Sequence, residues 1–139
     1  MKINVAIDDI PFGTSIQDIT VPDVLKKRIP TGLDYFDAAI GGEGFTPSMV
    51  TLFTGTPGCG KTTMMLTLAN SIQGHGGQVV FNTAEESLHQ VKMTSERLRL
   101  RNSFMVGGLD NVEELLKGCD KVRAANPDRP FFLIVDSCI

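Results

Sequence analysis

The sequence predicts an α/β fold in which helices flank a parallel sheet, and three observations support this. Short apolar runs suited to strands alternate along the chain with longer segments of helical periodicity. The run at residues 131–135 is apolar at every position, as in a strand buried on both faces of a parallel sheet. A glycine-rich turn at residues 55–60 separates an apolar run from a helical segment. We therefore expect a strand, a tight loop and a helix in succession there.

Composition limits the classes of protein that the chain can represent. Its 139 residues, 42% hydrophobic and 21% charged, suit a single soluble globular domain. No apolar run approaches the roughly 20 residues needed to span a bilayer, and no signal segment opens the chain, so we expect a cytoplasmic protein without membrane contact. A net charge of -3 does not favour a broadly basic nucleic-acid surface, although a local patch stays open. The widely spaced cysteines predict neither a disulfide framework nor a zinc site: Cys59, Cys119 and Cys138.

The chain divides near residue 30. Prolines and a glycine interrupt residues 1–30, which we interpret as an N-terminal extension or linker. The basic run at residues 26–28 could contact an anion, but we favour a solvated turn. Residues 31–139 form the predicted core domain.

Local patterns predict the elements on either side of the glycine-rich turn. Thr31 is expected to cap a short helix over residues 33–40 that ends at a pair of glycines. The β-branched and apolar run at residues 49–54 predicts the strand before the turn. The helix after the turn has apolar residues at the i, i+3, i+4 and i+7 positions: Met65, Leu68, Ala69 and Ile72.

Further strands and helices are predicted to alternate down to the C-terminal part. We expect strands at residues 79–81 and, more weakly, at 104–106, with a helix from Glu86 to about Arg101 between them. The spacing of Asp110 and Glu113 resembles a capping box and predicts a helix that ends before Pro127.

The turn carries the strongest functional signal, because every fixed position of the pattern G-x-x-x-x-G-K-[ST] is present. Glycines let the main chain wrap a triphosphate closely, and the following helix turns its unpaired N–H groups and positive dipole end toward the same anion. A chance match is the alternative, but the strand-like and helix-like flanks argue against it. We predict that a nucleotide contacts Gly55, Thr56, Pro57, Gly58, Cys59, Gly60, Lys61, Thr62 and Thr63.

Individual side chains suggest separate roles in binding phosphate, holding Mg²⁺ and activating water. Lys61 can supply its ammonium to the β and γ phosphates, and Thr62 can offer a hydroxyl to Mg²⁺. Asp136 ends the last apolar run and can hold the same ion, although a strand can also simply end at a solvated aspartate. Glu85 and Glu86 follow the second predicted strand; either could polarise water, or both could merely favour a helix N-terminus. The residues alone leave these readings of the two glutamates open.

Several segments together resemble the RecA-superfamily ATPases, most closely the bacterial RadA (Sms) family. The resemblance covers roughly residues 28–139 and rests on residues 28–37, the glycines near residue 41, the P-loop, and residues 83–92 with the pair that follows at 97–98. It implies that Glu85 is the catalytic glutamate, with Glu86 the less expected occupant of that role. It also implies that Asp136 is the Walker B acid. KaiC-like and DnaB-type ATPases are neighbours within the same superfamily.

The resemblance implies a function. The chain is expected to bind ATP with Mg²⁺ and to hydrolyse it as the core of a DNA recombination or repair ATPase. DNA and further copies of the chain, in a hexameric ring or filament, are the expected partners. A KaiC-like regulatory or assembly ATPase and a DnaB-like motor core are alternatives, as is nucleotide binding without hydrolysis.

Some features depart from the RadA pattern. Residues 1–27 lack the four-cysteine zinc module, the P-loop ends Lys-Thr-Thr, and residues 46–48 replace a Pro-Gly turn. The sequence given ends at Ile139, so we expect a RecA-like core truncated after the Walker B strand. The next strand of that fold, which lies between the P-loop and Walker B strands, would follow, as would the DNA-contacting loops and interface arginines. Without that strand, the two strands must either pair directly or leave backbone groups unpaired.

Overall fold

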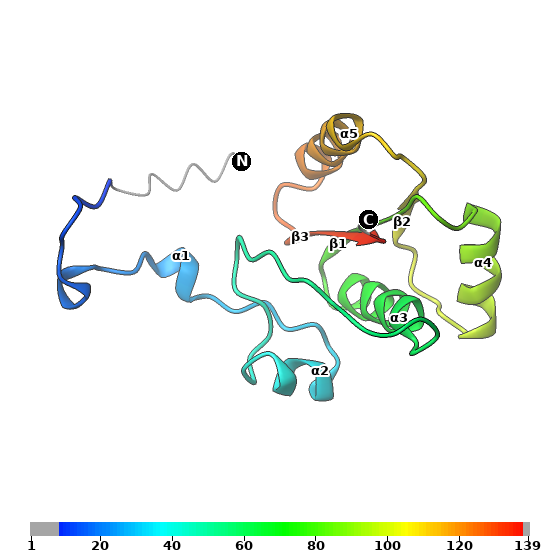
Figure 1. Cartoon of the computed structure of the whole chain (residues 1–139), viewed down its shortest axis with the longest axis horizontal. Helices are drawn as coiled ribbons and strands as arrows, with labels where there is room; N and C mark the ends of the chain where they lie inside the picture. The colour runs from blue at the N-terminus through cyan, green and yellow to red at the C-terminus, as the bar shows by residue number, and fades with distance from the viewer. Residues whose placement is uncertain (1–8, 138–139) are drawn as a thin grey trace.

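The computed structural model describes residues 9–137, in which helices and strands alternate (Figure 1). Two short helical elements lie in the N-terminal extension, and the remaining elements form the core. In chain order they are η1 (Ile16–Asp18), α1 (Asp23–Lys26), α2 (Asp34–Ala39), α3 (Lys61–Gly74), β1 (Gln78–Thr83), α4 (Leu88–Arg97), β2 (Met105–Gly107), α5 (Val112–Ala125) and β3 (Phe131–Asp136).

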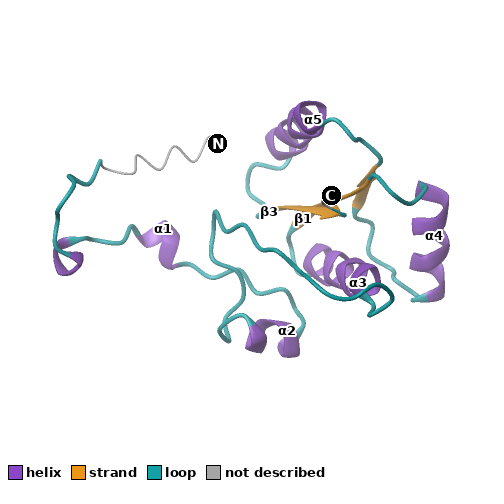
Figure 2. Cartoon of the chain, in the orientation of Figure 1, coloured by secondary structure: helices purple, strands orange, loops and turns teal. Residues whose placement is uncertain are grey.

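The sheet is parallel throughout and has the order β2-β1-β3. Figure 2 shows its strands in orange among the helices. β1 pairs with β3 along its whole length, from Gln78 opposite Phe131 to Thr83 opposite Asp136. Its other edge pairs with β2 over three residues. Parallel neighbours need crossover connections, and the helices α4 and α5 supply them. The predicted α/β class and parallel sheet are therefore confirmed.

Helices cover both faces of this sheet. α3 lies on one face and α5 on the other (Figure 1). The side chains of β1 alternate between them: Val79 and Phe81 pack with α3, whereas Val80 packs with Leu115 of α5. This period-two alternation explains why β1 is buried at every position. The apolar residues predicted for the helix after the turn are all buried in α3: Met65, Leu68, Ala69 and Ile72.

β3 is less buried than its sequence predicts. Phe132 and Ile134 face the α3 side, and Phe131 and Leu133 face the α5 side, yet all four are only half-buried. Among residues 9–137, the strand that pairs with β3 is β1, so the opposite edge of β3 lacks a neighbour in the sheet. An edge strand keeps part of both faces accessible. The expectation of complete burial is therefore wrong.

The strand expected at residues 49–54 is absent. The segment is extended but belongs to no strand, and its side chains are exposed, with Val50 at 97% and Leu52 at 76% of full accessibility. Both edges of β1 are already occupied by β2 and β3, and the segment does not pair with the free edge of β3. Phe53 instead stacks on Phe36 of α2, with ring centroids 5.6 Å apart. Of the two outcomes expected without an intervening strand, the described residues show the unpaired one.

The first helix of the core is positioned differently from the prediction. Thr31 does not cap α2, because Leu33 occupies the N-cap position without a capping side chain. The hydroxyl of Thr31 instead donates to the Asp37 carboxylate at 2.7 Å and accepts from the Leu33 N–H. Thr31 and Asp37 are both buried, so this network closes the loop onto the helix that follows it.

Two later helices begin one or two residues away from the predicted positions. Asn111, not Asp110, caps α5 by accepting the N–H of Glu114 at 3.0 Å. α4 begins at Leu88 because Ser87 and Gln90 form a capping box. It ends at Arg97, before the predicted residue 101, because the chain turns into the left-handed region at Arg99 with a φ of 57°.

The N-terminal part is anchored to the core where the extension ends. Ile29 forms an antiparallel bridge with Phe45, and the Arg28 guanidinium donates to the Thr46 hydroxyl at 2.8 Å. From residue 9 to residue 27, the side chains are exposed except for those of Ile19 and Leu25, which are half-buried. The domain boundary at residue 30 stays a prediction. Within residues 9–137, none of the helices has both the length and the apolar character that crossing a membrane requires.

Candidate nucleotide-binding site

The glycine-rich turn adopts a conformation that depends on its glycines. Gly58 has a φ of 79° and Gly60 a φ of 94°, both in the left-handed region that side chains disfavour. Gly60 is also the N-cap residue of α3, so the helix begins directly at Lys61. A backbone hydrogen bond from Cys59 to Thr56 closes the turn at 3.2 Å. The loop thus leads its main chain straight into the N-terminus of a 14-residue helix.

Lys61 bends back over this loop. Its ammonium group donates to the carbonyl oxygens of Gly55 at 2.7 Å and of Thr56 at 3.2 Å. These are the residues that open the turn, so the ammonium lies within the curve of the loop. In the part of the chain that the structure describes, two exposed carbonyls hold this cation, and an anion can displace them at little cost because it offers a stronger charged hydrogen bond.

A hydrogen bond between Thr62 and Asp136 joins the P-loop helix to the sheet. The Thr62 hydroxyl donates to a carboxylate oxygen of Asp136 at 2.9 Å, although 74 residues separate them. Thr62 is in the first turn of α3, and Asp136 is the last residue of β3. Hydroxyl and carboxylate oxygens are ligands that Mg²⁺ accepts, and it completes its shell with waters and substrate phosphates.

The Thr62 hydroxyl and the Asp136 carboxylate suit a Mg²⁺ ion that is bound jointly by the protein and by nucleotide phosphates. Within residues 9–137, no three side chains of His, Cys, Asp or Glu gather into a metal-binding cluster. These residues therefore offer no cluster for a metal ion whose ligands all come from the protein. One carboxylate beside one hydroxyl, next to a phosphate-binding loop, fits the way Mg²⁺ is held together with nucleotide phosphates.

Glu85 and Glu86 lie in the exposed bend that follows β1. The buried Thr83 hydroxyl accepts the Glu86 N–H at 3.2 Å and so fixes the start of this bend. Thr83 stands opposite Asp136 in the sheet register, so both glutamates leave the sheet at the edge where Asp136 lies. The structure therefore joins Thr62 to Asp136 and lets both glutamates leave the sheet at the same edge. Among the described residues, no hydrogen bond or ion pair links the side chains of the glutamates to Lys61, Thr62 or Asp136.

Two residues that support this edge were not singled out from the sequence. Thr83 holds the bend, and its signal is a threonine three residues before a glutamate at a strand end. Asn82, which is 1% exposed, accepts the Leu109 N–H at 3.0 Å and donates to the Leu109 carbonyl at 2.8 Å. These bonds tie the loop after β2 to the end of β1. An asparagine inside an apolar strand is the only sequence signal for that role.

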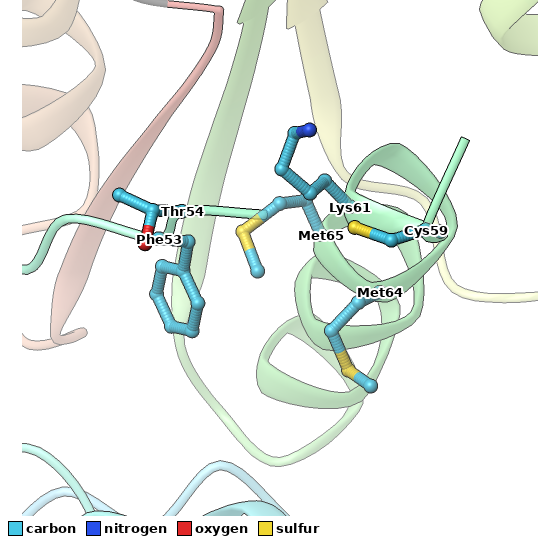
Figure 3. A pocket seen from close by; sticks show the side chains of 7 residues that line it. Phe53, Thr54, Cys59, Lys61, Met64 and Met65 are labelled. Atoms are coloured by element: carbon cyan, nitrogen blue, oxygen red, sulfur yellow. The ribbon is translucent and has the colours of Figure 1, made fainter. Parts of the chain in front are cut away.

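A cavity of about 210 Å³ lies beneath the loop, between Phe53 and Thr54 of the exposed segment and the first turns of α3 (Figure 3). Met64 and Met65 supply much of its lining. Cys59, Gly60 and Lys61 of the loop also line it, and in Figure 3 the Lys61 ammonium points away from Met64. The part of this lining formed by Phe53, Met64 and Met65 is apolar and does not suit phosphate, so we expect the anion at the part formed by the loop and Lys61.

These features define a class. A parallel α/β sheet, a glycine loop that opens a helix, and an acid at the end of a neighbouring strand characterise the P-loop nucleotide-binding ATPases.

Comparison with known families then gives the particular group. The family described as "ATPase: KaiC" matches residues 29–101, which is more than half of the chain. The chain therefore belongs to the KaiC ATPase family, and its fold is the RecA-like one expected from the sequence.

Curated relatives are DNA repair proteins named RadA. The chain is 30% identical to RadA of Streptococcus pyogenes serotype M3 over 118 residues, which are 84% of this chain and 24% of that protein. It is 28% identical to RadA of Bacillus subtilis over 134 residues, which are 91% of this chain and 28% of the relative. RadA of Mycobacterium tuberculosis is 38% identical over 81 residues, 58% of this chain and 17% of the relative. The chain thus spans about a quarter of the length of most of these relatives.

Proposed function

We propose that this chain binds ATP together with Mg²⁺ and hydrolyses the γ-phosphate. The observation that carries the proposal is the contact between Thr62 and Asp136 beside the Lys61 ammonium. It joins a phosphate-binding loop to a pair of oxygen ligands, and the two halves come from distant parts of the chain. A chance motif would not be expected to bring such a pair together.

Each residue has a defined part in the proposed reaction. The loop amides and the N-terminus of α3 stabilise the phosphate charge, and Lys61 exchanges its two carbonyl acceptors for phosphate oxygens. Thr62 and Asp136 would hold Mg²⁺, which neutralises charge on the phosphates when bound. Glu85 takes a proton from the attacking water at the sheet edge it shares with Asp136. Its exposed position leaves it free to approach that water.

Calorimetric titration with ATP, with and without Mg²⁺, tests the binding step. We expect Lys61→Ala to abolish measurable binding, because the loop loses the side-chain cation that now lies within its curve. Lys117→Ala removes an exposed lysine of α5 and serves as the matched control. Unchanged ATP affinity in Lys61→Ala would refute the proposed anion site.

Phosphate release tests the chemical step. Glu85→Gln should leave ATP binding intact and remove hydrolysis, whereas Glu86→Gln should leave both largely unchanged. The reverse result would assign the base to Glu86. Wild-type protein that binds MgATP without releasing phosphate would restrict the function to nucleotide binding.

We further propose that the ATPase serves DNA recombination or repair as an oligomer, as the printed name of its relatives suggests. A KaiC-like regulatory switch is the second candidate, and the family match favours it. The rate of ATP hydrolysis with and without single-stranded DNA separates them. Stimulation by DNA supports the repair function, and a slow rate that DNA does not alter supports the switch.

A further inference from the structure

We propose that the surface formed by α4 and residues 98–106 binds an acidic peptide segment of a partner protein, in which carboxylates flank one large apolar side chain. We call this surface the α4 groove; its hollow of about 290 Å³ lies between α4 and residues 100–106. Its lining shares no residue with that of the cavity beneath the P-loop. The inference concerns a protein partner and does not depend on the proposed ATPase activity.

Three exposed arginines lie at the end of α4 and just after it: Arg97, Arg99 and Arg101. If the helix continued, side chains two residues apart would not face the same way. α4 instead ends at Arg97, and the chain that follows it is not helical. Leu98 and Leu100 pack against the core there. The leucines therefore point inward, and the arginines that alternate with them stay in solvent.

Hydrogen bonds fix the turn that carries these arginines. The Leu100 N–H donates to the Ser95 carbonyl at 3.0 Å. The Asn102 N–H donates to the side-chain oxygen of Asn70 at 2.9 Å, and the Asn102 side-chain amide donates to the Asn70 carbonyl at 2.9 Å. Gly74 permits this approach, because a Cβ there would clash with the Asn102 amide nitrogen. A surface that is held in shape before binding loses little conformational entropy when a partner binds.

The positive charge of the three arginines is not balanced by the elements around them. α3, α4, β2 and the segment between α4 and β2 contain one acidic residue, Glu96, which pairs with Lys92 at 3.3 Å. Among residues 9–137, no salt bridge involves any of the three arginines. Three exposed positive charges therefore gather on one surface of a chain whose net charge is -3. Such a patch attracts and orients an acidic partner.

The hollow beside the arginines is largely apolar. Its lining includes Leu88, Val91, Leu100, Phe104 and Val106, together with Arg101. A large apolar side chain would bury its surface there, and a carboxylate next to it would form a charged hydrogen bond with the guanidinium. The volume is at the lower limit of small-molecule pockets, about 300 Å³, so the hollow suits one or two peptide side chains.

The same observations favour a peptide over a nucleic acid. Single-stranded nucleic acids combine a basic groove with aromatic side chains on which the bases stack. Phe104, the aromatic residue in this lining, is half-buried, and its ring centroid lies 6.4 Å from that of Phe81 in the core. Phosphate and sugar groups would also lose hydration in an apolar hollow without gaining hydrogen bonds. The partner that fits is therefore acidic and carries an apolar anchor.

Fluorescence anisotropy with a labelled synthetic peptide tests the proposal. The probe is Glu-Asp-Glu-Leu-Glu-Asp-Glu with both termini blocked. We expect saturable binding that weakens as the salt concentration rises. One control peptide has serine in place of leucine, and a second has amides in place of all the carboxylates. Each control should bind at least about tenfold more weakly than the probe.

Matched variants locate the binding surface. Arg101→Glu reverses a charge of the lining, and Val106→Asp changes a lining side chain that is 46% exposed in the folded protein. Each should weaken binding of the probe at least about tenfold, whereas the exposed α5 controls Lys117→Glu and Val112→Asp should not. Circular dichroism of each variant establishes that it is folded, and Arg101→Gln, which should also weaken binding, replaces Arg101→Glu if that variant unfolds.

Competition with a thymidine oligonucleotide separates the peptide from a nucleic acid. At about 0.15 M salt, we expect the oligonucleotide to leave the bound probe in place. If it displaces the probe and the serine peptide binds as tightly as the leucine peptide, the surface is a nucleic-acid site and the proposal is wrong. Absence of saturable binding of the probe, or equal losses in Val106→Asp and Val112→Asp, would also overturn it.

Discussion

Replacing Thr62 with valine removes one hydroxyl while keeping the shape of the side chain. That hydroxyl donates to the half-buried Asp136 carboxylate at 2.9 Å. A hydrogen bond to a charged group contributes roughly 1.5–3 kcal/mol when it is shielded from water. Since Asp136 keeps part of its surface in solvent, we expect about 1 kcal/mol for this contact. For a domain of this size, that corresponds to a fall in Tm of about 3–5 °C.

Urea unfolding without metal or nucleotide measures this contribution through a double-mutant cycle. The cycle compares the wild type with Thr62→Val, Asp136→Asn and the double variant. We expect a coupling energy of about 1 kcal/mol between the two positions. Thr94→Val, on α4 and outside the site, measures what a threonine-to-valine change does in a helix. A coupling energy within about 0.3 kcal/mol of zero would show that the contact does not stabilise the fold.

The same variant tests the metal assignment separately. Thr62→Val should lose the dependence of ATP binding on Mg²⁺, because the side chain no longer offers an oxygen ligand. Thr62→Ser keeps the hydroxyl and should retain that dependence. If calorimetry finds the same effect of Mg²⁺ in the valine variant and the wild type, Thr62 does not hold the ion, whatever the unfolding experiment shows.

Two other predictions concern backbone conformation and thiol chemistry. Gly44→Ala should destabilise the fold by about 2 kcal/mol or more in urea unfolding, because its φ of 97° is left-handed and a Cβ there would meet backbone. Ser48→Gly should instead be neutral or stabilising by up to about 1 kcal/mol, since Ser48 already adopts a φ of 63°. At pH 8, peptide mapping should find that a thiol reagent modifies the exposed Cys59 but not Cys119, because burial and the nearby Asp120 raise the pKa of the Cys119 thiol. Equal labelling of both cysteines in folded protein would contradict this.

Local sequence patterns predicted the elements that form the central core. α3, β1 and β3 follow from the spacing of apolar residues, because each buries a face whose period is set by its own backbone geometry. The P-loop could be predicted for the same reason, since glycine positions encode a backbone shape directly. The Lys61 and Thr62 side chains project from the first turn of that helix, so their closeness to the loop is also local.

Helix starts were harder to predict where two capping residues compete. Asp110 and Asn111 are adjacent and chemically equivalent as caps, and the structure uses Asn111. Thr31 has the chemistry of a cap but is buried against Asp37, a partner six residues away. Propensity ranks the residue types and does not choose among neighbours, so the choice depends on how the loop meets the core.

The segment at residues 49–54 marks the main limit of prediction from sequence. Its β-branched and apolar residues have strand propensity, but a strand exists only when another strand pairs with its backbone. No strand among residues 9–137 does so. Propensity reports how well a residue fits a half-buried pleated surface, and here that surface is not provided by the described residues.

The two halves of the candidate site are held in place differently, because one follows the exposed segment at residues 49–54 and the other belongs to the packed core. Thr62 belongs to α3, which packs on β1 and β3, so the pair formed with Asp136 is held by the main core. Residues 55–60 instead follow the unpaired segment and are exposed along their whole length. The half proposed to bind Mg²⁺ is therefore set by packing, whereas the half proposed to bind phosphate depends on the loop and on the two hydrogen bonds of Lys61. A nucleotide that replaces those bonds would order the loop, so protection of residues 55–60 from hydrogen exchange should rise on ATP binding while that of α3 changes little.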